Sequence, residues 1–172
     1  MKPLYRSAIV AVVQCLIVLS VAGKYTLDRE RLPRVWARAT AVDPNLFVRG
    51  RYVSLGLEVN PPPAAPPSNG VAVAWTGVRL SVVGDRLVAT PDPQGTLHVW
   101  ERPTRTAADP NGRQWVLAEP VAFFIPEHIP DPTHRAAGEE LWAEVTVPEK
   151  GVPRPIQLGV KKDGLLTPLE LR

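Results

Sequence analysis

Residues 42–59 read Val-Asp-Pro-Asn-Leu-Phe-Val-Arg-Gly-Arg-Tyr-Val-Ser-Leu-Gly-Leu-Glu-Val, and this stretch predicts the class of the fold. Its first part holds the turn-forming residues Asp43, Pro44 and Asn45, and Gly50 lies between two arginines at a tight corner. The second part alternates apolar with small or polar residues: Val53, Leu55, Leu57 and Val59 against Tyr52, Ser54, Gly56 and Glu58. An apolar period of two predicts a β-strand.

The same period recurs along most of the chain after residue 33. Val35, Ala37, Ala39 and Ala41 share one face of an expected strand. Further strands are expected at 71–75, 80–83, 87–89, 96–101, 114–117, 121–125, 140–147, 156–160 and 165–169. Turn residues separate them at 84–85, 92–95, 109–112, 150–151 and 163–164. About ten short strands predict an all-β domain, a small sandwich or a barrel-like sheet, whose only helix is a short one at 133–140.

The first 25 residues are expected to be a membrane anchor or a signal-like segment. Lys2 and Arg6 precede an apolar run at 7–22, which only Gln14 interrupts. About 20 apolar residues cross a bilayer as a helix, and Tyr25 at the interface extends the run toward that length. We therefore expect residues 7–22 to lie in a membrane.

Two questions about this head stay open in the sequence. The small residues Ser20-Val21-Ala22 also suit a cleaved secretory signal. Lys and Arg are more numerous after the run than before it, which by the positive-inside rule favours a cytoplasmic domain. The likeness of the head to an export signal, and the acidic Asp28 and Glu30 nearby, favour export. We expect an exported domain.

Length and composition limit the rest of the chain. The 172 residues leave room for a single domain at 26–172, with a Pro-rich loop at 60–70. The loop matches the spacing of a polyproline ligand, but a stiff surface loop is the simpler interpretation. Cys15, in the apolar run, is the only cysteine, so disulfides are excluded. The net charge of +3 is scattered without a basic stripe, and no nucleic-acid partner is expected.

No catalytic or metal-binding group emerges from the residue patterns. Glu127, His128, Asp131 and His134 lie close together, but the prolines at 126, 130 and 132 break any helix that would align them. A Ser-Lys nucleophile needs a buried lysine, whereas Lys24, Lys150, Lys161 and Lys162 lie near turns or strand ends. Ser54 lies on the polar face of its strand with no base nearby in sequence. We expect no metal, no cofactor and no catalytic residue.

Five tryptophans stand on five different expected strands: Trp36, Trp75, Trp100, Trp115 and Trp142. Core packing with a few strand-edge anchors explains most such residues. The alternative is an aromatic platform that binds a partner or a carbohydrate, and it requires at least two of the five to be exposed in one cleft.

The segment from Asp43 to Leu55 resembles the signature of the bacterial GDYXXLXY family, whose members read Asp-Pro-Arg-Asp-Leu-Leu-Arg-Gly-Asp-Tyr-Val-x-Leu-x-Tyr after one N-terminal membrane segment. A second segment, residues 123–127, is similar to the family's downstream Tyr-Phe-Val-Pro-Glu. The matching positions, which we expect to serve a structural or interaction role, are Asp43, Pro44, Arg49, Gly50, Tyr52, Leu55, Pro126 and Glu127.

Two departures from the family pattern matter. Arg51 stands where the family has aspartate, and Leu57 stands where it has its final tyrosine. Leu57 keeps the apolar face of its strand and loses only a hydroxyl. Arg51 inverts a charge beside Arg49, which would disable a site whose acid was catalytic and leave a structural corner intact.

The resemblance implies a membrane-associated protein of a family whose function is uncharacterised and whose members are often encoded beside multi-pass membrane proteins. We expect a single-pass protein of the bacterial inner membrane, with a periplasmic β domain that acts as a non-catalytic accessory partner of an integral membrane protein. The alternatives are a membrane-anchored hydrolase on a small β fold and an envelope ligand-binding module.

Overall fold

The computed structural model describes residues 3–42, 52–61, 74–106, 109–126 and 128–171. The chain divides into two compact units, residues 1–32 and 33–172, and each is described by itself. The first unit contains helix α1, Pro3–Arg31, which continues beyond Tyr25 to Arg31.

Within α1, the segment Ser7–Leu27 is long and apolar enough to cross a membrane. At a rise of about 1.5 Å per residue it measures about 31 Å, close to the thickness of a bilayer's hydrocarbon core. Its side chains are exposed, and apolar residues dominate its composition, so it has no continuous polar side to turn toward water. A signal sequence near the N-terminus shares these properties, and the helix is compatible with both expected forms of the head.

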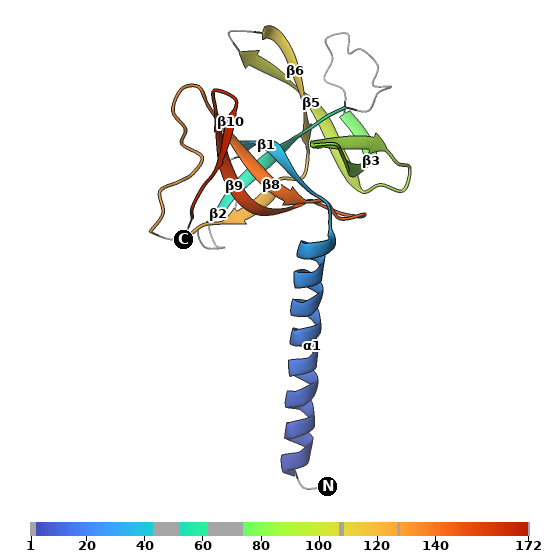
Figure 1. Ribbon diagram of the computed structural model, residues 1–172. Helices are drawn as coiled ribbons and strands as arrows, with labels where there is room; N and C mark the ends of the chain where they lie inside the picture. The colour runs from blue at the N-terminus through green and yellow to red at the C-terminus, as the bar shows by residue number, and fades with distance from the viewer. Residues whose placement is uncertain (1–2, 43–51, 62–73, 107–108, 127, 172) are drawn as a thin grey trace. The chain divides into compact units, whose positions relative to one another are not determined.

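The second unit is an antiparallel sheet of ten strands, which confirms the all-β prediction (Figure 1). The strands are β1 (Arg34–Val42), β2 (Tyr52–Val59), β3 (Ala74–Val83), β4 (Arg86–Pro91), β5 (Leu97–Thr106), β6 (Asp109–Leu117), β7 (Val121–Phe124), β8 (Glu139–Thr146), β9 (Arg154–Lys162) and β10 (Leu165–Pro168). Their order is β10-β9-β8-β1-β2-β6-β5-β3-β4, and β7 also pairs with β2.

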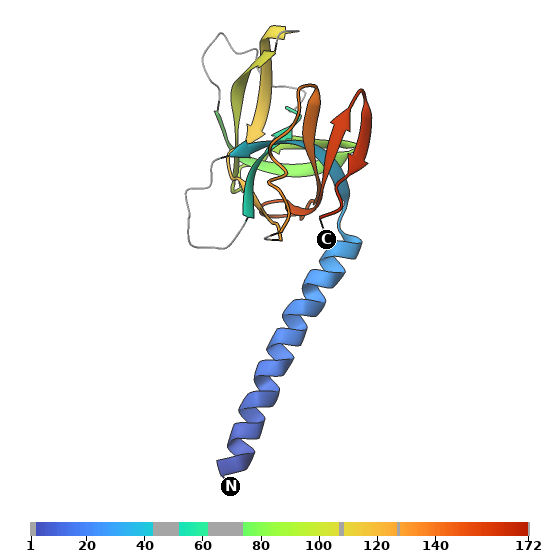
Figure 2. The ribbon, with the colours of Figure 1, turned by 90° about the vertical axis from the view of Figure 1, so that its left-hand side faces the viewer.

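The sheet curls so that β4 returns to the end of β2. The Asn60 backbone N–H donates to Leu87 O at 2.8 Å, and Ala89 N–H donates to Asn60 O at 3.0 Å. A third bond between Asn60 and β4 comes from the Asn60 side-chain amide, which donates to Leu87 O at 3.1 Å. The strands β2, β6, β5, β3 and β4 thereby form a partly closed ring, and two views show the curl together with the long β5–β6 hairpin (Figures 1 and 2). The barrel-like expectation describes this sheet better than two separate layers.

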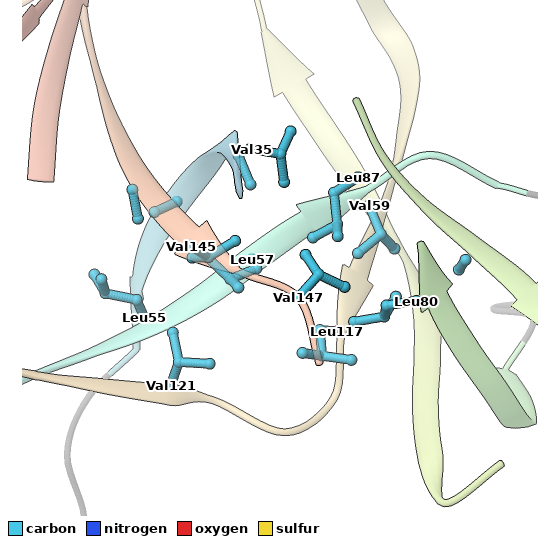
Figure 3. Packing of buried hydrophobic residues seen from close by; sticks show 14 of the residues in the cluster. Val35, Leu55, Leu57, Val59, Leu80, Leu87, Leu117, Val121, Val145 and Val147 are labelled. Carbon is cyan, nitrogen blue, oxygen red and sulfur yellow. The ribbon is translucent and has the colours of Figure 1, made fainter. Parts of the chain in front are cut away.

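Alternate residues of these strands fill one core (Figure 3). Leu55, Leu57 and Leu158 are fully buried, and Val145 on β8 packs in the same cluster. Burial of a leucine or valine side chain stabilises a fold by about 1.5–3 kcal/mol. The apolar face predicted for residues 53–59 is therefore the central wall of the core.

Three local predictions were wrong. Residues 133–140 form turns and the start of β8, because Gly138 takes a φ of 83°, which no helix contains. Residues 109–112 belong to β6, where Asp109 pairs with Thr106 across the hairpin. The segments 71–75 and 80–83 were expected to be separate, but Ala74–Val83 is one strand with a bulge at Gly77, whose φ is 74°.

The face of β2 that the alternation marks as polar is buried at its centre, whereas Tyr52 and Glu58 toward its ends are half-buried. Ser54 is 9 % exposed, and Gly56 is buried as well. A Cβ at Gly56 would lie 3.3 Å from Thr40 Oγ1, Val42 Cγ2 and Val116 Cγ1, so these neighbours lean over the glycine. Because β2 has partners on both edges and glycine at its centre, flanking side chains cover both of its faces.

Candidate functional site

The structure brings the described parts of the two stretches of the family resemblance together, although about 70 residues separate them in sequence. Strand β7 pairs with the first half of β2, with Tyr52 opposite Phe124 and Leu55 opposite Val121. The rings of Tyr52 and Phe124 lie 6.1 Å apart at an angle of 51°. Phe124 is 65 % exposed, so this end of the pair presents an aromatic surface.

The predicted motif residues divide between described and undescribed parts of the chain. Leu55 belongs to the core, and Pro126 is half-buried and accepts a hydrogen bond from Ile129 N–H at 3.2 Å. Asp43, Pro44, Arg49, Gly50, Arg51 and Glu127 lie outside the described residues. Among the described motif residues, Tyr52 alone combines a polar group with partial exposure.

A larger site lies elsewhere on the sheet, where residues from β1, β8, β9 and β10 floor a groove of about 700 Å³. This volume falls in the range of small-molecule binding sites. The turn between β3 and β4, at Gly84 and Asp85, forms part of the lining, and Gly164 and Leu166 contribute from the β9–β10 hairpin. The bonds from Asn60 to β4 fix the β3–β4 turn beside the sheet face.

Strand register explains the groove floor. Trp142 on β8 stands opposite Gly159 on β9 and Arg38 on β1. The β1–β2 register continues this row to Glu58 on β2. Trp36 on β1 stands one row away, opposite Glu144. Two tryptophans thus line a single groove, but both are half-buried, whereas the aromatic-platform interpretation expected them to be exposed.

The charged groups of the floor form a connected network. Arg38 Nη2 lies 3.1 Å from Glu140 Oε1, and Arg38 Nη1 lies 3.9 Å from Glu58 Oε2. The Trp142 Nε1–H group donates to Glu140 Oε2 at 3.1 Å. The Lys161 ammonium stands 4.6 Å from the centre of the Trp142 ring. Glu140 therefore orients both an indole and a guanidinium, while Lys161 covers part of the indole face.

Glu58 is the member of this network whose charged form is disfavoured by burial. Burial raises the pKa of the Glu58 carboxyl, and the neighbouring Gln114 side chain and Arg38 charge offset only part of this effect. Glu58 Oε2 is buried without a hydrogen-bond partner among the described residues. The polar surroundings of the carboxylate are thus the Gln114 side chain and a long ion pair with Arg38.

The metal-site and nucleophile candidates of the sequence do not form a site among the described residues. His134 and Asp131 are 3.8 Å apart in an exposed loop, and Asp131 Oδ1 also accepts bonds from Thr133. Within the described residues, no group of three His, Cys, Asp or Glu side chains is placed to hold a metal ion. Ser54 is buried on β2 and is not part of the groove lining.

Sequence reasoning found Trp36 and Trp142 but missed their charged neighbours. Arg38, Glu58, Glu140 and Lys161 all occupy the face opposite the core on adjacent strands. The alternation pattern places each of them outward, but only the strand order brings them together. Neither a family model, nor a curated protein, nor a solved structure matches this chain.

Proposed function

We propose that this protein is a membrane-anchored, non-catalytic β domain that serves as an accessory partner of an integral membrane protein. The observation that carries the proposal is the helix segment Ser7–Leu27, which offers an apolar surface on every side. Leucine, isoleucine and valine at the centre of a bilayer each favour insertion by about 0.3–0.6 kcal/mol. A single such helix tethers the β domain to a membrane.

The remaining parts of the proposal follow from the sequence. Resemblance to the GDYXXLXY family supports a bacterial inner-membrane location and a multi-pass partner. The signal-like head supports a periplasmic β domain. The described residues of the groove supply ion pairs and aromatic surface, which supports a binding role.

The anchor is tested by charge insertion into the helix. The double variant Val12→Arg/Leu16→Arg places two charges in the apolar segment, and each charge costs about 2.5–3.5 kcal/mol at the bilayer centre. We expect the variant to leave the carbonate-resistant membrane fraction. Val83→Arg adds a charge to an exposed position of β3 and should stay in that fraction. Equal fractionation of all three proteins would refute the anchor.

The partner is tested by crosslinking the full chain in intact cells, followed by detergent extraction and identification of the crosslinked species. A defined multi-pass membrane protein is the expected species, and loss of that protein should lower the level of this one. Recovery of the β domain alone, at an unchanged level, would reject the accessory role. A reporter fused at Arg172 assigns the side of the membrane on which the domain lies.

A second function is favoured by the groove with Trp36 and Trp142, namely an envelope ligand-binding module. This function needs neither the multi-pass partner nor the family resemblance. It depends on the arrangement of the groove alone.

A further inference from the structure

We propose that the groove floored by Trp36 and Trp142 binds a saccharide that carries a carboxylate or a comparable anionic group. The proposal rests on the second function above, ligand binding by the β domain, and not on the membrane partner. Its elements are two fixed indoles, a surplus of cations and an open shape.

Both indoles are held in place before any ligand arrives. Trp142 is fixed by its bond to Glu140 and by the Lys161 side chain over its ring. Trp36 packs against the backbone of β9, where a Cβ at Gly159 would lie only 2.8 Å from Trp36 Cζ3. Aromatic rings fixed in this way cost little conformational entropy on binding.

The accessible apolar surface of the groove comes from the two half-buried indoles and the half-buried Leu166. Val35, Ala37 and Leu87 also line it, but each is at most 4 % exposed and belongs to the core. The flat C–H faces of a pyranose ring stack well on such a surface, and its hydroxyls bond to carboxylate and guanidinium groups at the rim. The mixture of flat aromatic and charged groups suits a sugar better than a lipid chain, which requires continuous apolar walls.

The charges of the groove favour an anionic sugar. Arg38 is balanced by Glu58 and Glu140. Among the described residues, no carboxylate lies within 4.0 Å of the Lys161 ammonium, and its recorded contact is the Trp142 ring. Arg86 adds an exposed cation from the opposite wall, and the exposed Asp85 beside it adds a carboxylate, so the described lining holds four cations against three carboxylates. A ligand carboxylate beside Trp142 would pair with Lys161 in a charge-assisted bond.

A peptide added as an extra strand fits this site less well. Strand β10, the outermost strand beside the groove, is four residues long and ends at Pro168. Proline cannot donate a backbone hydrogen bond, and short strands with proline are typical of edges that do not accept another strand.

The test uses the full chain in detergent micelles and a panel of tetrasaccharides. The acidic members are galacturonate, glucuronate and mannuronate oligomers, and the controls are the matching neutral hexose oligomers and an oligoglutamate peptide. Binding is followed by tryptophan fluorescence and calorimetry. We expect an acidic tetrasaccharide to bind with a Kd below about 1 mM, and its neutral counterpart to bind about tenfold more weakly.

Matched substitutions assign the site. Trp142→Ala and Lys161→Gln should each weaken acidic-sugar binding about tenfold, and Lys161→Gln should weaken acidic-sugar binding more than neutral-sugar binding. Two variants serve as controls. Trp100→Ala removes an exposed tryptophan on β5, and Lys162→Gln removes the lysine next to Lys161, which pairs with Glu139. Both should bind within about twofold of the original protein. Lys161→Gln changes a surface group, so it keeps the test valid if Trp142→Ala destabilises the fold.

Three outcomes would overturn the proposal. These are the absence of binding by every saccharide, equal binding by the Lys161 and Lys162 variants, and tight binding of the oligoglutamate peptide alone. Membrane fractionation of the same variants is read separately. If the protein stays in the membrane fraction but binds no saccharide, this inference fails and the anchor does not.

Discussion

The indole of Trp36 on β1 lies directly against Gly159 on β9, although β8 separates these two strands in the sheet order. A Cβ at Gly159 would come within 2.8 Å of Trp36 Cζ3 and 3.1 Å of Thr167 O. The tryptophan therefore reaches across Trp142's strand and uses the space that glycine leaves free.

Gly159→Ala should destabilise the β domain by about 1–3 kcal/mol, the usual cost of forcing a methyl group into a packed site. Urea denaturation measures the change. The double variant Trp36→Ala/Gly159→Ala should lose less than the sum of the two single variants, because the clash disappears with the ring. Strictly additive losses would show that the Thr167 carbonyl, and not Trp36, opposes the methyl group.

Glu58→Gln should make the domain more stable at neutral pH. Burial raises the pKa of Glu58 above the value of about 4.3 found in unfolded peptides. Between the unfolded and the folded pKa of Glu58, the folded protein therefore binds more protons than the unfolded chain. The free energy of unfolding falls as the pH rises through this interval. The glutamine variant lacks this loss, so its advantage should grow from pH 4 upward and persist at neutral pH.

The check is urea denaturation of both proteins across this pH range, with the exposed Glu149→Gln as the control for a lost charge. Arg38 keeps its 3.1 Å contact with Glu140 in the Glu58 variant. A Glu58→Gln protein that is less stable than the original at pH 7 would mean that the 3.9 Å ion pair outweighs the cost of burial.

Asp92→Asn should weaken the turn between β4 and β5. The Asp92 carboxylate accepts a bond from Gln94 N–H at 3.0 Å and contacts Arg79 at 2.8 Å, and these contacts lower its pKa. The stability that they supply is present above the unfolded value of about 3.9 and is lost as pH falls through the lower folded value.

The two proteins should therefore differ in thermal stability at pH 7 and converge in strongly acidic solution. Asp163→Asn is the control, because Asp163 occupies a turn with a φ of 50°, which asparagine also adopts. A difference between wild-type and Asp92→Asn that stays constant down to pH 2 would contradict the role of the charged carboxylate.

Alternation along each strand was enough to predict the fold class and the core, since Leu55, Leu57 and Val59 are buried as expected. It did not predict the charged network of the groove. Arg38 meets Glu58 and Trp142 only because β1 lies between β2 and β8, and β8 follows β1 by about a hundred residues in the chain. Sequence periodicity assigns a face to each residue but does not determine which strands are neighbours.

The errors have a similar cause. Thr76-Gly77 has the composition of a strand end, but β3 continues through a bulge at this point. The Asp92 N–H donates to the Gly77 carbonyl at 2.8 Å and stabilises the bulge. Alternation places Ser54 on the polar face of its strand, yet the residue is buried, with strand partners on both edges of β2. Both effects depend on residues distant in sequence.

Leu57→Tyr tests the departure from the family signature, in which tyrosine occupies this position. Leu57 is fully buried opposite Ala39, and Val145 packs in the same cluster. A tyrosine here would add volume and bury a hydroxyl, so we expect a loss of about 2–5 kcal/mol. Leu57→Met conserves volume and should cost less than about 1.5 kcal/mol. Urea denaturation compares the two. If the tyrosine variant is as stable as the methionine variant, the core keeps room and a polar partner for the family's residue, and the resemblance extends to packing as well as to sequence.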